Sequence, residues 1–386
     1  VGGVCFLMPQ NKKAMTFVII THVPHIFEQQ KYYAYAPYVR EMNIWLKYVD
    51  EVIIVAPLHN SILSAIDSTY VTQKIDFREV SSFNINGLSG VIKTVLKSPF
   101  VLWQIFKAMK AADHIHLRCP GNMGLLGCFV QMLFPSKTKT AKYAGNWNPK
   151  AKQPWSYRLQ KWILSNTFLT RNMQVLVYGA WPNQTENIKS FFTATYKNHD
   201  TSPLLPKVLK GTITFVFVGT LVKAKNPLYA VHLVSELFQK GHNVVLRIYG
   251  EGEQRALLEQ YILKHKLEGI IVLEGNQNQE ILKKAYQNSH FVVLPSESEG
   301  WPKAIAEGMF WGCLPVATAV SCVPFMLDYG NRGVLLEMNL ENDIRQLEAV
   351  LEDESCFQKM SKNGSDWART YTLDVFESEI KKLLHS

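Results

Sequence analysis

The stretch Phe291–Thr318, FVVLPSESEGWPKAIAEGMFWGCLPVAT, decides the fold class of this 386-residue chain. An apolar strand, Phe291–Pro295, is followed by a polar loop and then by a helical pattern, Pro302–Trp311. Gly312 ends that helix, and a second apolar strand, Leu314–Ala317, follows it. Strands that are apolar on both faces and alternate with helices indicate a parallel sheet covered by helices. The stretch therefore predicts one β-α-β unit of a doubly wound α/β domain.

The same alternation of strands and helices runs through both halves of the chain. Further strands are predicted at Thr16–Thr21, Val52–Ala56, His114–Leu117, Thr140–Tyr143, Val175–Tyr178, Ile213–Gly219, Val244–Tyr249, Ile270–Leu273 and Gly333–Leu336. Further helices are predicted at Lys31–Tyr48, Leu88–Lys110, Pro227–Lys240, Glu253–Lys266, Gln279–Asn288 and Thr372–Leu384. We therefore expect two Rossmann-like domains, 1–200 and 201–370. They should divide within the polar, proline-containing segment Tyr196–Lys210, with a C-terminal helix in 371–386 that would cross back to the first domain.

Composition excludes several protein classes. Apolar residues make up 47% and charged residues 19% of the chain, which is typical of a globular protein and not of a disordered one. The longest nearly uncharged apolar stretch, Gly124–Phe134, is about half the ~20 residues that a membrane-spanning helix needs. The six cysteines are scattered without C-x-x-C spacing, so neither a disulfide scaffold nor a thiolate zinc site is expected. A reducing, cytoplasmic compartment suits this usage.

The first residues form an irregular segment, Val1–Ala14. Its apolar part, Val4–Met8, is too short for the core of a signal peptide. Met15 directly precedes the first predicted strand, so either Met15 is the biological start and Val1 an upstream alternative, or the segment is a short disordered extension. Neither alternative gives the segment a function.

Two glutamates flank the start of the predicted helix Pro302–Trp311. Glu299 would lie in the loop at the carboxyl end of a strand, where ligands of open α/β sheets bind. Proline suits the first position of a helix, which places Glu307 about one and a half turns inside it. Backbone N–H groups at a helix N-terminus favour an anion such as a phosphate, and a carboxylate can hold two neighbouring hydroxyls of a ribose. The alternative is a helix with two ordinary surface glutamates.

The spacing of these two glutamates and the residues around them resemble a known signature. Seven residues separate Glu299 from Glu307 within PSESEGWPKAIAEGMFWGCLPVAT, as in the family 4 retaining glycosyltransferases, which are group 1 glycosyltransferases. The resemblance implies a GT-B fold, in which two Rossmann-like domains face each other across a cleft. It also implies that Glu307 binds the ribose of a nucleotide-sugar donor. Glu299 would contact the donor sugar as a catalytic residue, together with the segment that follows it, Gly300, Trp301, Pro302 and Lys303.

A second segment, Val218–Pro227, resembles the part of this family that holds the donor diphosphate. By position, Lys225 corresponds to the family's lysine and is the other catalytic candidate, and Gly219 adjoins the donor. Thr220 stands where the family usually has an arginine, so one cation is missing. Lys223 or Lys303 would replace it, since a lysine needs less exact geometry than an arginine to bind phosphate. The alternative is that the lysines are ordinary solvated loop residues.

Two glycines mark further loops of the expected nucleotide pocket. Gly250 opens a G-x-G that follows a predicted strand, and Gly275 lies in the loop that would contact the base. A G-x-G alone is a weak signal, and the third glycine of the dinucleotide fingerprint is missing. The resemblance therefore favours a nucleotide-sugar over a nicotinamide cofactor at this position, but it does not name the base.

The first half offers weaker acceptor-side candidates. His22 and His25 follow one predicted strand, while His116 and Asn122 lie at the end of another. Each histidine is at least as well explained as a structural or polar loop residue. Many relatives carry a histidine after the strand that corresponds to Thr140–Tyr143, but no histidine stands there in this chain.

No sequence signal for a metal or a cofactor is present. The chain has no D-x-D triplet and no metal-spaced cluster of histidines and carboxylates. It also lacks the G-x-S-x-G elbow of serine hydrolases and the Walker A loop. We therefore expect no cofactor and no metal, with the nucleotide-sugar as a substrate and with lysines and backbone N–H groups meeting its phosphate charge.

Charge is divided unevenly along the chain. The net charge is +9, with 22 basic and 10 acidic residues in 1–200 (+12) and 19 against 22 in 201–386 (−3). Aromatic residues lie among the cations of Leu88–Lys110 and Lys137–Trp162. Such a mixture suits the interface of an anionic membrane. It is also compatible with nucleic acid, although no nucleic-acid module is recognisable, or with core aromatics beside solvated lysines.

The sequence thus predicts a hexosyltransferase that works from the cytoplasmic face of the membrane. Its expected partners are a nucleotide-sugar donor and a saccharide or lipid-linked saccharide acceptor of bacterial surface polysaccharide synthesis, without nucleic acid. One alternative is a sugar-nucleotide epimerase of the same fold. Another is a non-catalytic membrane- or nucleic-acid-binding protein.

Overall fold

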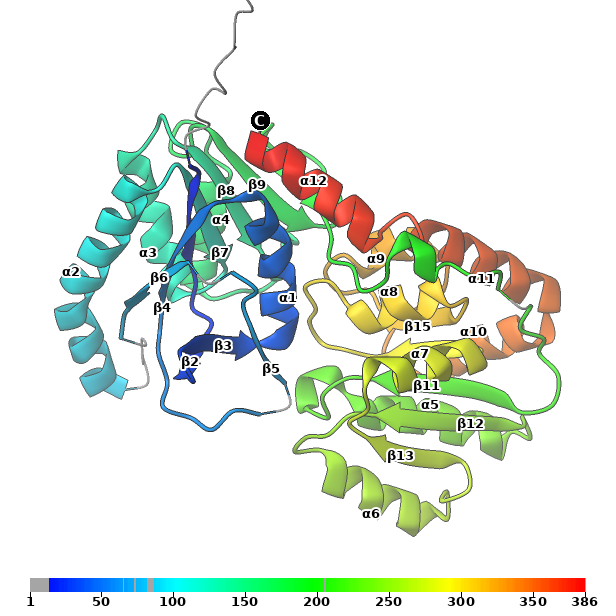
Figure 1. The fold of residues 1–386 in the computed structure, drawn as a ribbon. Coiled ribbons are helices and arrows are strands. Elements are labelled where there is room, and N and C mark those ends of the chain that lie inside the picture. The colour runs from blue at the N-terminus through cyan, green and yellow to red at the C-terminus, as the bar shows by residue number, and fades with distance from the viewer. Residues whose placement is uncertain (1–13, 65, 73, 82–86, 205, 386) are drawn as a thin grey trace, which may run out of the picture.

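The computed structural model describes residues 14–385 except 65, 73, 82–86 and 205, and describes side chains in the helix from Gly87 to Ala111 only from residue 98 onward. The expectations for residues 1–13 and for the side chains of Lys93 and Lys97 lie outside the described residues. The chain folds into two α/β domains, each built on a parallel sheet, as the sequence predicts (Figure 1).

The first domain contains a seven-stranded parallel sheet. Its strands, in spatial order, are β10 (Ile188–Phe191), β9 (Met173–Tyr178), β8 (Thr138–Tyr143), β7 (His114–Cys119), β1 (Thr16–Ile20), β4 (Glu51–Ala56) and β6 (Ile75–Glu79). The side chains of β1 alternate between two cores, because Phe17 and Ile19 face one side of the sheet while Val18 and Ile20 face the other. Both faces of this sheet are therefore buried.

Different helices cover the two faces of the first sheet. On one face lies α1 (Ala36–Trp45), and on the other lie α2 (Gly87–Ala111), α3 (Asn122–Val130) and α4 (Trp155–Leu164) (Figure 1). Within the described parts of the chain, no helix combines the length and apolarity that crossing a bilayer requires.

The second domain contains a six-stranded parallel sheet between two helical layers. Its strands, in spatial order, are β13 (Ile271–Gly275), β12 (Val244–Tyr249), β11 (Ile213–Val218), β14 (Phe291–Leu294), β15 (Leu314–Thr318) and β16 (Val334–Leu336). Its helices are α5 (Pro227–Gln239), α6 (Arg255–His265), α7 (Gln279–Asn288), α8 (Lys303–Phe310), α9 (Val323–Met326), α10 (Leu340–Glu352) and α11 (Glu354–Ala368). Short 3₁₀ turns are η1 (Leu46–Tyr48), η2 (Gln131–Leu133), η3 (Asn198–Asp200), η4 (Lys223–Lys225) and η5 (Asp328–Gly330).

The last helix, α12 (Leu373–His385), leaves the second domain and packs on the first (Figure 1). Glu377 accepts hydrogen bonds from Lys47 at 2.8 Å and from the hydroxyl of Tyr48 at 2.7 Å. Phe376 is buried next to Phe191 and Phe192. The two domains are therefore joined both by the linker after β10 and by this helix.

The predicted helix Lys31–Tyr48 is wrong in its first turn. The segment begins with β3 (Lys31–Tyr35), which pairs with β2 (His25–Glu28) and β5 (Asp67–Thr69) in an antiparallel sheet that the sequence analysis did not predict. Aromatic residues favour strands, and the ring of Tyr32 stacks on Phe77 with centroids 4.4 Å apart. Pro37 then lies in the first turn of α1, where proline is favoured.

The boundaries of α8 also differ slightly from the prediction. Pro302 precedes the helix in an extended conformation with φ −72° and ψ 94°, so Lys303 is the first helical residue. Proline cannot donate to the helix, but it fixes the direction in which the chain enters it. Glu307 is consequently the fifth residue of α8, on the same side as Lys303 one turn earlier.

Candidate active site

A lysine and a glutamate meet where the loops after β11 and β14 lie side by side. These strands are neighbours in the second sheet, and the backbone N–H of Glu297 donates to the carbonyl of Ala224 at 2.9 Å, which joins their loops. Lys225 Nζ then lies 2.5 Å from Glu299 Oε1. The glutamate side chain is 7% exposed and the lysine side chain 29%. The two residues that the sequence proposed as catalytic are thus held in one ion pair.

The segment between Glu299 and α8 forms the contact between the domains. A Cβ on Gly300 would lie 2.9 Å from the carbonyl oxygen of Ala144, so a larger residue would push the domains apart. The indole of Trp301 is buried against the rings of Trp367 and Tyr178. The N-terminus of α8 therefore points at the carboxyl ends of β8 and β9 in the first domain. Backbone N–H groups and the helix dipole make this position favourable for an anion.

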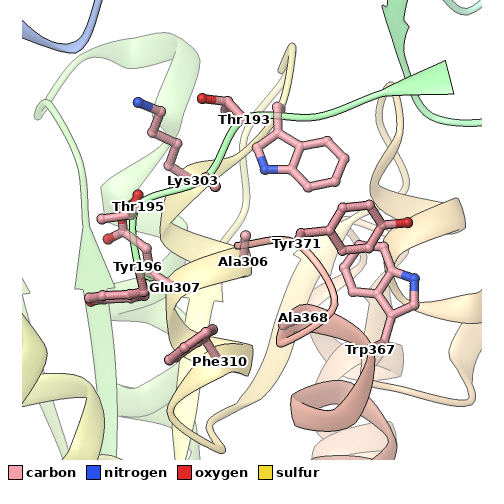
Figure 2. Close-up of a pocket in the computed structure, with 12 residues that line it drawn as sticks. Thr193, Thr195, Tyr196, Lys303, Ala306, Glu307, Phe310, Trp367, Ala368 and Tyr371 are labelled. Atoms are coloured by element: carbon pink, nitrogen blue, oxygen red, sulfur yellow. Dashed lines mark hydrogen bonds between the residues drawn. The ribbon is translucent and has the colours of Figure 1, made fainter. Parts of the chain in front are cut away.

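Glu307 lies deeper along α8 and faces the linker between the domains. Its Oε1 accepts a hydrogen bond of 2.7 Å from the hydroxyl of Thr195 (Figure 2). Burial raises the pKa of Glu307, although the Thr195 hydrogen bond and the charge of Lys303 oppose the rise. Burial also lowers the pKa of Lys303, partly offset by Glu307 and Glu41. The Glu307 carboxylate and the Lys303 ammonium group are therefore both partly shielded from solvent.

These two charged residues line a small pocket with a cavity volume of about 20 Å³ (Figure 2). The linker forms one wall, α8 forms the floor, and aromatic residues from the end of α11 and the turn after it form the other wall (Figure 2). The lining residues are Thr193, Ala194, Thr195, Tyr196, Trp301, Lys303, Ala306, Glu307, Phe310, Trp367, Ala368 and Tyr371. A cavity of this size has room for about one water molecule.

The glycines of the predicted nucleotide loops serve close packing between loops. A Cβ on Gly250, whose φ is +151°, would lie 1.9 Å from the carbonyl oxygen of Gly219. The backbone N–H of Gly250 also donates to the carbonyl of Gly275 at 2.9 Å. Three of the predicted donor-binding glycines therefore lie together at the carboxyl edge of β11, β12 and β13, and a side chain at position 250 would separate their loops.

Thr220 stands where the resembled family has an arginine, and the two lysines proposed to replace that arginine lie in different surroundings. Thr220 and Lys223 are exposed in the loop after β11, near Lys225. Lys303 is directed toward the first domain, because its charge interacts with Glu41 and Arg118 as well as with Glu307. The choice between these two predicted replacements stays a prediction.

The structure separates the acceptor-side candidates. His22 is exposed and lies beside Gly121, where a Cβ would be 2.9 Å from the His22 Nδ1. Asn122 begins α3 directly after that glycine. His22 and Asn122 therefore lie together at the carboxyl edge of the first sheet.

The expectation that His25 and His116 face an acceptor is corrected. The ring of His25 is buried and bonded to the hydroxyl of Tyr70 at 2.7 Å. His116 is also buried, where its Nδ1 bonds to the hydroxyl of Thr140 at 2.9 Å. Burial lowers the pKa of His25 to about 4 and that of His116 well below its ordinary value. Both rings are packing residues in this structure.

Sequence reasoning missed an ionic cluster that faces α8 from the first domain. Glu41 on α1 pairs with Arg118 at 2.6 Å and with Lys142 at 3.0 Å, and all three side chains are buried or nearly so. Lys142 Nζ also donates to the carbonyl of Phe192 in the linker at 3.2 Å. One signal was available: Glu41 stands on the apolar side of its helix, between Val39, Met42 and Trp45. A glutamate in that position needs buried cationic partners.

The described residues contain no cluster of three or more histidine, cysteine or carboxylate groups able to hold a metal ion. In the described part of the site, the positive charge comes from lysines and from Arg40 and Arg118. Chemically, the arrangement offers a helix N-terminus and Lys225 for phosphate groups, and two carboxylates for hydroxyl groups.

Comparison with known proteins agrees with this arrangement. Residues 206–367 match the family model "Glycosyl transferases group 1". Poly(glycerol-phosphate) alpha-glucosyltransferase of Bacillus subtilis is 25% identical over 191 residues, which are 47% of this chain and 27% of that protein. The putative colanic acid biosynthesis glycosyltransferase WcaL of Salmonella typhimurium is 28% identical over 147 residues, which are 36% of each chain. The chain spans about half or less of the length of the curated relatives it matches.

The fold is shared over nearly the whole chain with solved structures. The crystal structure of HepE from Anabaena in complex with UDP and glucose superposes with a TM-score of 0.66 at 13% identity. The match covers 97% of this chain and 100% of HepE. At that identity the likeness shows the fold, while the family model identifies the domain that carries Lys225, Glu299 and Glu307. The chain as a whole therefore has the GT-B fold, and its second domain is similar to the group 1 glycosyltransferases.

Proposed function

We propose that this chain is a retaining glycosyltransferase that moves a hexose from a nucleoside-diphosphate sugar to an acceptor hydroxyl. The observation that carries the proposal is the Lys225–Glu299 pair at the N-terminus of α8, with Glu307 farther along the same helix. An ammonium group and a helix N-terminus suit a diphosphate, while the two carboxylates suit the hydroxyls of a sugar and a ribose.

In the proposed reaction, the acceptor attacks from the side on which the donor diphosphate leaves. The bond from the acceptor oxygen to the anomeric carbon forms while the bond to the phosphate oxygen breaks, and the acceptor proton passes to the leaving diphosphate. Lys225 and the N-terminus of α8 would stabilise the negative charge that grows on that diphosphate. Glu299 would hold the donor sugar through its hydroxyls, and Glu307 would hold the ribose.

The donor and acceptor classes rest on relatives. HepE was solved with UDP and glucose, and the names of two relatives refer to poly(glycerol-phosphate) and to colanic acid. We infer a nucleotide-sugar donor and an acceptor that is a saccharide or lipid-linked saccharide of surface polysaccharide synthesis. The acceptor would approach over the first domain, where His22 and Asn122 lie at the sheet edge, while the enzyme sits on the cytoplasmic face of the membrane.

The test begins with a panel of UDP-, GDP- and ADP-sugars in a thermal-shift assay. A donor at 100 times its dissociation constant should stabilise the protein by about 2.7 kcal/mol. The selected donor is then incubated with candidate acceptors, and release of nucleoside diphosphate and the anomeric configuration of the product are measured. Release that depends on acceptor, with the donor configuration kept, is the expected result.

Other outcomes would contradict the proposal in distinct ways. Conversion of the nucleotide-sugar without any acceptor would indicate an epimerase. Inversion of the anomeric configuration would exclude the same-side reaction. Absence of both donor binding and turnover across the panel would favour a non-catalytic protein of this fold.

A further inference from the structure

Helices α2 and α4 each expose a stripe of aromatic and basic side chains on the side away from the sheet. On α2 the stripe is Phe100, Trp103, Lys107 and Lys110, at helical spacing. Its apolar counterparts on the opposite side of the helix, such as Val101 and Ile105, are fully buried. Such a helix is apolar on both sides, which packing against the sheet alone does not explain.

The same arrangement recurs on α4 and in the turn that follows it. Trp155, Arg158 and Trp162 lie on one side of α4 and are exposed. Phe168 and Arg171 continue the stripe, with the guanidinium of Arg171 4.7 Å from the ring centroid of Phe168. On both α2 and α4, exposed aromatic rings therefore lie beside exposed cations.

Helix α3 lies between the two stripes. It contacts both α2 and α4, and all three helices cover the same face of the first sheet. Phe129 and Leu133, one turn apart at its end, are also exposed. We call the combined surface the docking face; it comprises Phe100, Trp103, Lys107, Lys110, Phe129, Leu133, Trp155, Arg158, Trp162, Phe168 and Arg171, with Lys150 and Lys152 in the loop before α4.

Tryptophan exposure singles out this surface. All nine tryptophans of the chain are described, and only Trp103, Trp155 and Trp162 are more than half exposed, at 53%, 67% and 61%. All three belong to the docking face. Large exposed apolar patches mark interaction surfaces, and tryptophan is favoured where one side of an interface is apolar and the other wet.

Charge indicates which partner this surface fits. From Gly87 to Gln184 the chain has thirteen lysines and arginines, and Asp113 is its only acidic residue. The Asp113 carboxylate accepts a hydrogen bond from the backbone N–H of Thr16 at the base of the sheet. The docking face itself contains no carboxylate, and the exposed Glu186 lies at its edge, where it lines one hollow together with Arg171. Aromatic rings among an excess of cations match the interfacial region of an anionic bilayer, which has acidic headgroups above an apolar interior.

The structure corrects part of the sequence expectation about which cations serve this purpose. Lys137 donates to the carbonyls of Met109 and Lys110 at the end of α2. Lys139 and Lys142 are buried residues of β8, and Lys161 donates to the carbonyl of Asn148 at 3.0 Å. These four lysines stabilise the domain. Six exposed cations remain on the docking face: Lys107, Lys110, Lys150, Lys152, Arg158 and Arg171.

We propose that the docking face inserts its aromatic side chains into the interfacial layer of an anionic phospholipid bilayer, with its six cations against the headgroups. This deepens the membrane location in the proposed function and rests on that part of it, but it uses no residue of the donor site. Docking would hold the first domain, and with it the expected acceptor side of the cleft, at the surface where a lipid-linked saccharide lies.

The first experiment is flotation of the full chain with vesicles, without donor or acceptor. Binding is expected to vesicles of equal phosphatidylglycerol and phosphatidylcholine, and not to phosphatidylcholine alone. It should weaken from 0.1 M to 1 M salt, because the Debye length falls from about 10 Å to about 3 Å. Replacing Lys107, Lys110 and Arg158 together by glutamine should weaken binding by about fivefold per cation, roughly a hundredfold in all. The matched control replaces Lys264 and Lys359, exposed in the second domain, and should bind as the parent does.

The second experiment tests insertion rather than electrostatic attraction. Vesicles with brominated acyl chains should quench the fluorescence of the three exposed tryptophans, and replacing these by serine should abolish the quenching and weaken binding at least tenfold. Leu133→Ser tests the centre of the docking face, with Leu263→Ser on α6 as its control. The two leucines are 65% and 64% exposed, so their removal should affect stability equally. Only Leu133→Ser should reduce binding.

Several results would overturn the proposal. Protein that does not float with anionic vesicles at low salt does not dock on lipid. Binding without quenching would mean that the cations attract the surface but the aromatic rings stay outside. If the docking face instead joins two copies of the chain, light scattering would show a dimer, and replacing the three tryptophans would convert it to a monomer. A protein that transfers sugar but does not bind vesicles would refute the docking proposal and leave the proposed reaction intact. A protein that binds vesicles but transfers no sugar would refute the proposed reaction and leave the docking proposal intact.

Discussion

Glu307 is the residue whose surroundings define the proposed ribose contact most closely. Its carboxylate is half-buried and already accepts a hydrogen bond from Thr195, so a ribose hydroxyl must share or replace that contact. Hydrogen bonds to a charged group contribute about 1.5–3 kcal/mol. We therefore predict that Glu307→Ala lowers the affinity for the best-binding nucleoside diphosphate between about tenfold and a hundredfold, measured by isothermal titration calorimetry.

A matched control for this prediction lies in the loop before α8. Glu297 is exposed, and its backbone rather than its side chain bonds to Ala224. Glu297→Ala should leave nucleotide affinity unchanged. If the two variants bind the nucleotide equally well, Glu307 does not contact the ribose.

The same carboxylate predicts a pH dependence of nucleotide binding. Burial raises the pKa of Glu307 above its ordinary value of 4.5, so the protonated form is populated at a higher pH than for an exposed glutamate. A protonated carboxyl accepts hydrogen bonds less well than a carboxylate. Affinity should therefore fall as the pH is lowered toward this raised pKa, and in Glu307→Gln this acid limb should be missing. An identical acid limb in both proteins would assign it to another group.

Lys225 carries a different prediction, because in the proposed reaction the charge on the leaving diphosphate grows toward the transition state. Lys225→Ala should lower kcat by about a hundredfold or more, the size of effect seen when one such charge donor is removed, while nucleotide affinity changes less. Steady-state kinetics and calorimetry separate the two effects. Lys359→Ala, in an exposed position of α11, serves as the control. A variant that changes only KM would make Lys225 a ground-state contact.

At the residue scale, the sequence predicts the parts of the site that are close together in the chain. Glu299 and Glu307 lie on one loop and helix, and their spacing is visible without a structure. The pairing of Lys225 with Glu299 depends on β11 lying next to β14, which a parallel topology makes plausible but does not specify. Thr195 could not be found, because its place beside Glu307 depends on the path of the linker between the domains.

At the element scale, strongly apolar strands were predictable and weakly patterned ones were not. The central strands of both sheets are buried on both faces, so they appear as apolar runs such as Val244–Tyr249. Edge strands such as β6 and β10 are partly exposed and have mixed composition, and the sequence analysis missed them. The β3 strand was hidden because its aromatic residues also fit the apolar side of a helix. The segment forms a strand rather than a helix because it pairs with β2 and β5.

The helix α12 carries a prediction at this scale. Phe376 is 1% exposed and packs between the first domain and the linker, whereas Glu377 forms one partly exposed ion pair, with Lys47. Truncating a buried phenylalanine costs about 3–5 kcal/mol, while a surface ion pair contributes about 1 kcal/mol or less. Phe376→Ala should therefore lower the free energy of unfolding in urea by several kcal/mol and Glu377→Ala by less than about 1 kcal/mol. Equal effects would mean that α12 is held by its ion pairs rather than by its apolar side.

At the scale of the whole molecule, the contact region between the domains contains a concentration of buried charge. Glu41 and Arg118 belong to the first domain, Lys142 reaches the linker, and Lys303 approaches from the second domain. Lys142 Nζ is also 5.0 Å from the ring centroid of Phe376 in α12. One glutamate thus neutralises cations at the point where both domains, the linker and the last helix meet. The charge difference between the two halves of the sequence gave no indication of this arrangement, because it sums over residues that lie far apart.

Glu41→Gln tests how much this arrangement depends on its one carboxylate. Removing one partner of a buried ionic cluster leaves the other charges uncompensated and costs about 3–5 kcal/mol. Burial opposes the ionisation of Glu41, but the charges of Arg118 and Lys142 outweigh burial and lower its pKa to about 2. The unfolded chain therefore binds a proton at higher pH than the folded protein does, and the stability due to Glu41 is lost as the pH falls from about 4.5 toward 2.

The expected result is a lower free energy of unfolding for Glu41→Gln at pH 7 than for the parent, by about 3–5 kcal/mol in urea titrations. The difference between the two proteins should then shrink as the pH is lowered from about 4.5, because only the parent loses the contribution of Glu41. Glu51→Gln is the control: Glu51 is exposed at the start of β4, and surface substitutions of this kind usually change stability by less than about 0.5 kcal/mol. A difference between parent and Glu41→Gln that stays constant down to the lowest pH at which both proteins fold would show that the carboxylate's charge is not what joins these elements.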